Sequence, residues 1–194
     1  MQKLSASDLL SLEQYARERP VIRARMIDHR RQRQLRIGEH CSWSFEDRDT
    51  VRYQVQEMLR AERVFEAAGI AEELAAYNPL IPDGHNLKAT LLIEYEDPAE
   101  RAKRLTELRG FERHCWMRVA GFEPIYAIAD EDLERENDTK TSAVHFLRFE
   151  FTAQMLESLR DGGGFSAGVD HPAYRFSVDP IPQGLRTTLM ADFN

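Results

Sequence analysis

The chain has 194 residues and a net charge of −7 at neutral pH, with 42% hydrophobic and 30% charged residues. These proportions are typical of a folded globular protein and exclude an intrinsically disordered one. The acidic balance argues against a general nucleic-acid binder, which needs a basic surface for the phosphates. No apolar run approaches the roughly 20 residues of a membrane helix, and the first residues lack a signal-peptide pattern. We therefore expect a cytoplasmic protein with a single domain over 1–194.

Positive charge is concentrated in the segment 17–36, which holds eight arginines against the two acids Glu18 and Asp28. Pro20 lies inside this segment. Proline disfavours helical backbone in the residue before it and suits the first turn of a helix. We therefore predict one helix that ends near Glu18 and a second that begins at Pro20. These helices open a helix-rich part that extends to about residue 80.

The arginine run has two interpretations. Guanidinium groups form paired hydrogen bonds with carboxylates and phosphates, so the run is a candidate surface for docking an acidic partner or binding an anion. Alternatively, its arginines pair with acids of the same chain, as charged surface runs commonly do. The candidate partner-binding residues are Arg25, Arg30, Arg31 and Arg33.

The segment 49–65 has the pattern of an amphipathic helix. At about 100° per residue, one apolar stripe runs along it, made of Val51, Val55, Met58 and Phe65. Glu62 falls near the middle of this stripe, and an isolated buried carboxylate is costly. We therefore expect Glu62 to be buried and neutralised by Arg25 or Arg33 from the second N-terminal helix, or to act as a metal ligand or acid/base group.

A sheet-rich part at about 88–194 follows turn signals within residues 75–89, where Asn-Pro and Pro-Asp-Gly occur. We expect strands at 89–96, 114–121, 123–129, 141–152 and 174–178, helices at 97–110 and 152–160, and a short acidic segment at 130–136. This order predicts an α+β fold in which the helical N-terminal part packs on a mixed or antiparallel sheet with covering helices. A ferredoxin-like sheet is one arrangement compatible with it.

Two histidines and an aspartate are the candidate polar groups of the sheet-rich part. His145 shares a strand face with Leu147, so we expect it to be partly buried, as a hydrogen-bonded core residue or as a ligand. Asp170 and His171 precede a proline in extended chain, where they present a ligand or general base, or form a structural turn. With Glu62 they are the candidate catalytic or metal-binding groups, and their spacing matches no metal motif.

Four segments carry a resemblance to a known family: "FEDRDTVRYQVQEMLRAER", "ELAAYNPLIPDGHNLKATLLIEYED", "KTSAVHFLRFEFT" and "GVDHPAY". On these segments the chain resembles the bacterial domain-of-unknown-function family 3501 along essentially its full length. The resemblance implies no catalytic residues, and it leaves the cofactor and any metal unknown. It does imply a context, because such proteins are commonly encoded near rubrerythrin-like proteins and iron-sulfur proteins resembling heterodisulfide reductases, and hence a redox or peroxide-response role.

Two hypotheses of function follow. In the first, the protein is a non-enzymatic accessory in a rubrerythrin-linked redox or peroxide response, and its arginine-rich helices dock a rubrerythrin-like or iron-sulfur protein. In the second, it is an enzyme or metal-binding protein with a Glu/His/Arg site between the helical part and the sheet. The first predicts an exposed basic surface, and the second predicts a cleft in which carboxylate and imidazole groups converge.

Overall fold

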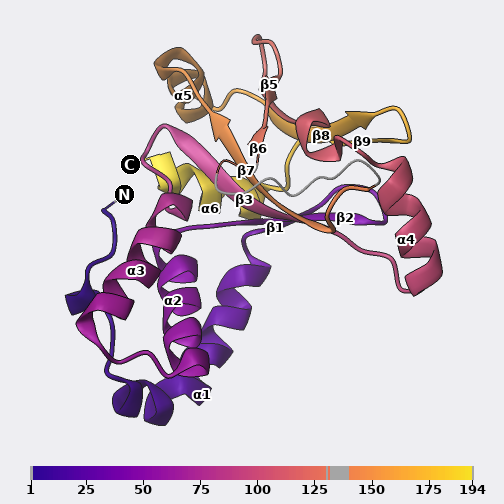
Figure 1. Cartoon of the computed structure of the whole chain (residues 1–194). Coiled ribbons are helices and arrows are strands. Elements are labelled where there is room, and N and C mark those ends of the chain that lie inside the picture. Colours follow the sequence, from indigo (N-terminus) through magenta and orange to yellow (C-terminus); the bar gives the residue numbers. More distant parts are fainter. Residues whose placement is uncertain (1, 130, 132–139, 194) are drawn as a thin grey trace.

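The chain folds into helices and two antiparallel sheets, which confirms the predicted α+β class (Figure 1). The computed structural model describes residues 2–129, 131 and 140–193. Apart from Glu131, the predicted acidic segment 130–136 lies outside the described residues. In the part of the chain that is described, no helix is both long enough and apolar enough to cross a membrane.

The N-terminal layer consists of three helices, α1 (Leu12–Arg31), α2 (Arg48–Glu62) and α3 (Ala67–Tyr77). Asp47 caps α2, because its carboxylate accepts a hydrogen bond from the Thr50 N–H at 2.8 Å. Short 3-10 turns at Ala6–Asp8 and Asn78–Leu80 flank the layer. Its small apolar core is made of Leu4, Val51, Val55, Leu59, Leu74 and Ile81.

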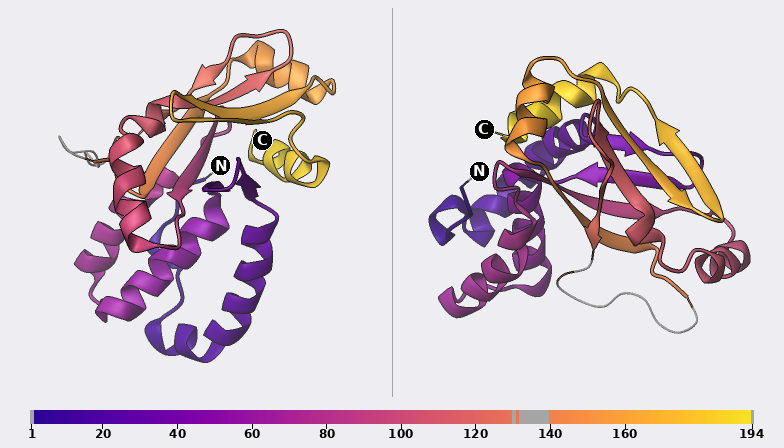
Figure 2. Two further views of the ribbon diagram at one scale, coloured as in Figure 1. Left: turned by 90° about the vertical axis from the view of Figure 1, so that its right-hand side faces the viewer. Right: turned by 90° about the horizontal axis from the view of Figure 1, so that it is seen from above.

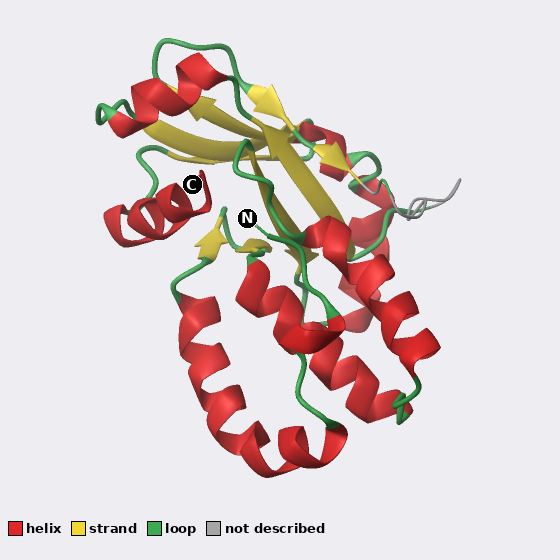
Figure 3. Ribbon diagram, turned by 90° about the vertical axis from the view of Figure 1, so that its left-hand side faces the viewer, coloured by secondary structure: helices red, strands yellow, loops and turns green. Residues whose placement is uncertain are grey.

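The predicted helix break at Pro20 is wrong, because α1 runs continuously from Leu12 to Arg31 with the proline inside it. Figure 3 shows the helix strongly bent along its length instead of interrupted. A proline inside a helix removes one backbone hydrogen bond and its ring crowds the preceding turn, and a bend relieves the crowding without ending the helix. The start at Leu12 is set by Ser11, whose side chain accepts from the Gln14 N–H at 3.2 Å.

Sheet A has the strand order β1-β2-β3-β7-β6. Its strands are β1 (Gln34–Arg36), β2 (Cys41–Phe45), β3 (Asn86–Ile93), β6 (Ile128–Ala129) and β7 (Val144–Glu150). The predicted strands at 89–96 and 141–152 correspond to β3 and β7. β1 and β2 come from the predicted helix-rich part, and they were not expected as strands.

Sheet B has the order β5-β4-β8-β9, with β4 (Cys115–Val119), β5 (Ile125–Tyr126), β8 (Phe165–His171) and β9 (Tyr174–Val178). The predicted strand 123–129 is divided, since β5 pairs with β4 in sheet B and β6 pairs with β7 in sheet A. The chain thus passes from one sheet to the other at Ala127. The strand pairs of the described residues are antiparallel, and they form two sheets instead of the single sheet of a ferredoxin-like arrangement.

The main core is built from residues of both sheets, and its largest fully buried side chains include Trp43, Phe45, Phe149, Met117 and Phe165. Sheet A lies between the helical layer and sheet B (Figure 1). Helices α5 (Ala153–Arg160) and α6 (Gln183–Met190) lie at one end of the sheets, and α4 (Pro98–Glu107) lies at the other (Figure 2). The predicted helices at 97–110 and 152–160 are α4 and α5, whereas α6 was not expected.

The hydroxyl of Tyr174 joins the two sheets. It donates to the carbonyl oxygen of Ile37 at 2.8 Å and accepts from the N–H of His40 at 3.0 Å, so that β9 is tied to the β1–β2 hairpin. Gly38 lies directly under this hydroxyl with a φ of 69°. A Cβ atom there would lie 2.5 Å from the Tyr174 oxygen. The close approach and the left-handed backbone both require glycine at this turn.

Candidate functional site

Helix α1 presents an exposed face that is basic and partly apolar. Its other face is held against α2 by Glu57, which accepts from the Tyr15 hydroxyl at 2.5 Å and from two Arg19 nitrogens at 2.8 Å each. Two apolar side chains point outward, since Val21 is 72% exposed and Ile27 is 44% exposed. Arginine is enriched at protein interfaces, and the two aliphatic side chains add apolar contact area to the same face.

The predicted partner-binding arginines behave differently from one another. Arg25, Arg30 and Arg31 are exposed on α1. Arg30 lies over the ring of Tyr53 at 5.6 Å, and Arg31 pairs with the exposed Asp28 at 3.2 Å. Within the contacts of the described residues, Arg25 has no ion pair. These three side chains remain accessible to a partner.

Arg33 is not a surface residue, and its prediction as a docking residue is corrected. It is only 2% exposed, and its guanidinium donates to the carbonyl oxygens of Phe45 at 2.9 Å and Glu46 at 3.2 Å. It also pairs with Asp47 at 3.3 Å and with Asp192 from the last 3-10 turn, Ala191–Phe193. The planar fork of donors suits this crowded site, where it joins α1, β2 and the C-terminal turn.

The prediction that Glu62 is buried and neutralised by Arg25 or Arg33 is wrong. Glu62 is exposed and is the last residue of α2, because Arg63 adopts a left-handed backbone with φ 56° that ends the helix. The predicted stripe therefore stops before Phe65, which is 74% exposed. The buried face of α2 lies earlier, at Val51, Val55 and Leu59.

His145 is fully buried in β7, as expected from its apolar strand face. Its Nε2 donates to the carbonyl oxygen of Ser142 at 3.0 Å and lies 2.9 Å from the Thr141 hydroxyl. Its Nδ1 lies 4.0 Å from Oε2 of Glu112, a buried carboxylate oxygen without a hydrogen-bond partner among the described residues. The hydrogen bonds assign His145 to the packed core rather than to an open site.

Asp170 and His171 lie in extended chain, as expected, at the end of β8 where a hairpin leads to β9. Asp170 accepts from Nδ1 of His114 at 3.0 Å and from the Tyr126 hydroxyl at 2.6 Å. His171 donates from Nε2 to the carbonyl oxygen of Arg109 at 3.0 Å and accepts the Ala173 N–H at Nδ1, 3.2 Å away. Both ring nitrogens of His171 are therefore used, which fixes it as a neutral structural histidine.

Asp170 and His171 differ in how their surroundings shift their pKa values. Burial lowers the pKa of His171, and the hydrogen bond to the Arg109 carbonyl opposes this shift only in part. The lowered pKa keeps the ring neutral. Burial would raise the pKa of Asp170, but the hydrogen bonds from Tyr126 and His114 outweigh it and lower that pKa. An ionised aspartate that orients a half-exposed histidine is the arrangement of an acid/base pair, and His114 was not identified from the sequence.

The predicted set of Glu62, His145 and His171 does not form one site. His145 lies next to Glu112 and His171 packs against Phe111, both in the short turn Phe111–His114 that precedes β4, whereas Glu62 is exposed at the end of α2. No group of three or more histidine, cysteine, aspartate and glutamate side chains in the described ranges is arranged to hold a metal ion.

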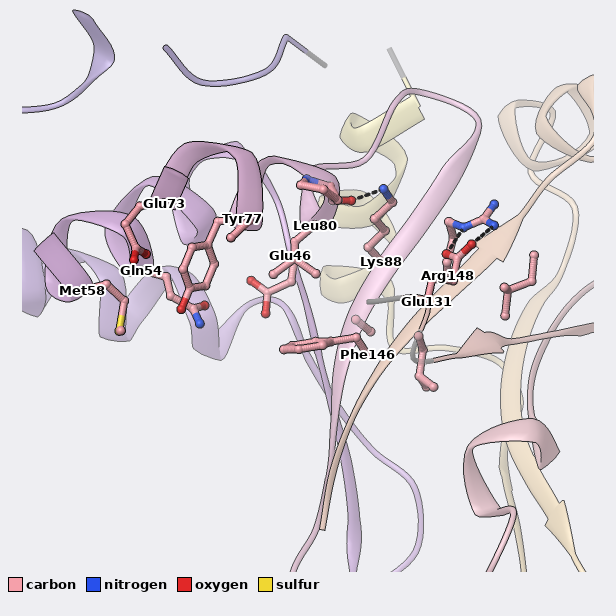
Figure 4. Close-up of a pocket in the computed structure, with 15 residues that line it drawn as sticks. Glu46, Gln54, Met58, Glu73, Tyr77, Leu80, Lys88, Glu131, Phe146 and Arg148 are labelled. Atoms are coloured by element: carbon pink, nitrogen blue, oxygen red, sulfur yellow. Dashed lines mark hydrogen bonds and ion pairs between the residues drawn. The ribbon is translucent and has the colours of Figure 1, made fainter. Parts of the chain in front are cut away.

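A cleft of about 620 Å³ does lie between the helical layer and sheet A, where the second hypothesis expected one (Figure 4). No histidine is among the described residues that line it. The side chains that define it are Glu46, Gln54, Met58, Glu73, Tyr77, Leu80, Lys88, Glu131, Phe146 and Arg148. They come from α2, α3, β3, β7 and the segments next to these elements.

Glu46 is the buried carboxylate of this cleft, with an exposure of 5%. Its Oε2 accepts from the Thr50 hydroxyl at 2.5 Å, and its Oε1 accepts from the Thr90 hydroxyl at 2.7 Å. Figure 4 shows the carboxylate pointing into the space between Tyr77 and Phe146. The prediction from sequence missed Glu46, although a carboxylate directly after "CSWSF", in which apolar residues alternate with serine, was a signal that could have identified it.

The basic groups at the other end of the cleft are already bonded. Arg148 donates to both carboxylate oxygens of Glu131 at 2.7 Å and also pairs with Glu150. Lys88 donates to the carbonyl oxygen of Pro79. Burial lowers the pKa of Lys88, with the charge of Lys3 adding to the effect. The cleft is therefore polar at both ends and apolar between them.

The Arg33 cluster makes stability depend on pH through Asp192. Burial raises the pKa of this carboxyl to about 6, with Arg33 opposing the shift, whereas an unfolded aspartate titrates near ~3.9. Between these values the folded state holds more protons, so its stability falls as the pH rises from about 4 to about 6. The loss from this group is expected to be roughly 2–3 kcal/mol. The difference in unfolding free energy between the wild type and Asp192→Asn should fall across this interval, and a flat or rising difference would refute the assignment.

Comparison with known proteins agrees with the resemblance noted in the sequence. The family described as "Protein of unknown function (DUF3501)" matches residues 3–193. No curated protein matches the chain. A crystal structure at 1.90 Å resolution of a novel protein of unknown function from Burkholderia pseudomallei K96243 is similar to it, with a TM-score of 0.93 and 46% identity over 100% of both chains. The chain belongs to the DUF3501 family.

Proposed function

We propose that the protein is a non-enzymatic accessory protein of the cytoplasm that docks an acidic partner protein on the exposed face of α1. The observation that carries the proposal is the set of accessible arginines on this face together with the outward-pointing Val21 and Ile27. Guanidinium groups favour association with acidic surfaces, and aliphatic side chains between them add contact area that excludes water.

The charge distribution of the chain supports a directed encounter. The arginine run stands against a net charge of −7 for the whole chain, so the rest of the molecule is acidic. A partner with an acidic surface is repelled by most of the molecule and attracted to α1. Such complementarity sets orientation and association rate more than it sets affinity.

For the partner, we propose a rubrerythrin-like or iron-sulfur redox protein of the same organism. The support is the genomic context that the family resemblance implies, and it is associational. The accessory protein would then act within a redox or peroxide response by binding one of its metalloproteins, with the redox chemistry residing in the partner.

Charge reversal on α1 tests the docking surface. In the double variant Arg25→Glu and Arg31→Glu, the association rate with a purified rubrerythrin-like protein of the same organism is expected to fall by roughly tenfold or more at low salt, and its salt dependence is expected to weaken. Stopped-flow or surface-based kinetics at several ionic strengths measure both quantities.

The matched control is the double variant Arg101→Glu and Arg175→Glu, which changes the net charge equally at exposed positions on α4 and β9. It should leave the association rate within about twofold of the wild type, because distant charges are screened. Equal slowing by the two double variants, or no binding by the wild type, would contradict the proposed surface. Circular dichroism of each variant shows whether the fold is retained.

A further inference from the structure

We propose that the cleft between the helical layer and sheet A binds an organic ammonium ion with an aliphatic body, and that the carboxylate of Glu46 anchors the ammonium group. This site is separate from the exposed face of α1, and the inference does not depend on the docking of a partner. It rests on the environment of Glu46, on the walls of the cleft and on the state of its basic groups.

The first step concerns the charge of Glu46. Its carboxylate is largely removed from solvent, the residue being 5% exposed, and it is held by the hydroxyls of Thr50 and Thr90. Thr50 accepts the Asp47 N–H at 2.9 Å, and its own hydroxyl hydrogen has Glu46 as the nearer acceptor at 2.5 Å and the Asp47 carbonyl oxygen as the farther one at 3.1 Å. No arginine or lysine side chain in the described part of the chain forms an ion pair with Glu46. A buried carboxylate oriented by hydroxyl donors and lacking a counterion is complementary to a cation.

The second step concerns the walls. Tyr77 and Phe146 stand on either side of the Glu46 carboxylate (Figure 4). Aromatic faces attract ammonium groups through their quadrupole, and the attraction grows when water is excluded. Met58 and Leu80 also line the cleft and provide hydrocarbon surface for an aliphatic chain. The walls therefore fit an amine that carries a hydrocarbon body better than a small hydrated metal ion.

The third step concerns the sign of the ligand's charge. A second carboxylate, Glu73, lines the same end of the cleft, and burial followed by the charge of Glu62 raises its pKa. At the other end, Arg148 is engaged by Glu131 and Glu150, and Lys88 by the Pro79 carbonyl. An anion would compete with Glu131 and Glu150 for Arg148, whereas a cation meets a carboxylate that still lacks a charged partner among the described residues.

Calorimetric titration with three probes of the same length and different charge tests the site. Hexylamine is expected to bind saturably, whereas hexanol and hexanoate are expected to bind at least about tenfold more weakly, because only the amine can pair with Glu46. Glu46→Gln, which keeps the shape of the side chain, should weaken hexylamine binding by roughly tenfold or more. Equal binding of hexanoate and hexylamine would overturn the proposal.

The matched control is Glu72→Gln, which removes the same charge from an exposed position of α3 outside the cleft. It should change the hexylamine affinity by less than about twofold, since exposed charges are screened. A second variant, Leu80→Trp, fills the cleft and should abolish binding while Glu46 is retained. If Glu46→Gln fails to fold, Leu80→Trp and the three probes still test whether the cleft binds the ammonium ion. Unchanged hexylamine binding in Leu80→Trp would place the ligand elsewhere and refute the inference.

Discussion

Replacement of Arg33 by methionine is expected to lower the free energy of unfolding by about 3–5 kcal/mol, the usual cost of removing one partner from a buried ion pair. Arg33 is 2% exposed and is the guanidinium that Asp47 and Asp192 share. Without Arg33, two largely buried carboxylates face each other, and Asp47 keeps its contact with His29 at 2.7 Å. Urea denaturation followed by far-ultraviolet circular dichroism measures the loss.

Arg31→Met is the control, because Arg31 is two residues away and its side chain is 74% exposed. Its effect should stay within about 0.5 kcal/mol, as for most surface substitutions. The double variant Arg33→Met and Asp192→Asn should recover part of the loss, since it removes one of the unpaired charges. A loss in Arg33→Met no larger than that in Arg31→Met would show that the cluster does not contribute to stability.

Substitution of Gly38 by alanine is expected to cost about 2–4 kcal/mol, the sum of a left-handed backbone and a steric clash. With a φ of 69°, the new Cβ atom would lie 2.5 Å from the Tyr174 oxygen and 2.8 Å from the Phe176 ring. The Tyr174 hydroxyl cannot move away without losing its bonds to Ile37 and His40. Thermal or urea denaturation measures the cost.

Gly121→Ala separates the cost of the left-handed backbone from the cost of the steric clash. Gly121 also has a positive φ, of 87°, and no described atom lies within 4 Å of the place that a Cβ atom would take. The substitution should therefore cost only about 1–2 kcal/mol, from the backbone alone. If Gly38→Ala and Gly121→Ala cost the same, the contact between the hairpin and Tyr174 is not a constraint on the fold.

Elements with strong local signals were predictable. The helix α4 begins where Asp97 caps it, and its carboxylate accepts from the Glu100 N–H at 2.6 Å. The alternation in β7 placed His145 and Leu147 on the buried face, as the structure confirms. In both cases the sequence determines the element through contacts between residues a few positions apart.

Elements that depend on distant contacts were not predictable. β1 has three residues, Gln34–Arg36, which is too short for a period-two pattern, and its pairing with β2 defines it. The helix α2 shows why Glu62 was misplaced, since the period was right but the left-handed Arg63 ended the helix at that residue. Non-glycine residues rarely adopt this conformation, so nothing in the sequence marked the end.

The cleft was beyond prediction for a related reason. Lys88 and Arg148 face it together because β3 and β7 align them directly opposite each other, although they are far apart in the chain. Glu46 reaches the same cleft through Thr50 on α2 and Thr90 on β3. A site assembled from the outward faces of two strands and two helices appears only once the sheet register is known.

The bond between Arg33 and Asp192 also sets an order of events during synthesis. The two residues are 159 positions apart in the sequence. Chains emerge from their N-terminus, so Arg33, Asp47 and the strands β1 and β2 are all made before this carboxylate exists. Closing so long a loop is among the slower steps of folding. The nascent protein must therefore carry a guanidinium with an incomplete set of partners until Asp192 has left the ribosome.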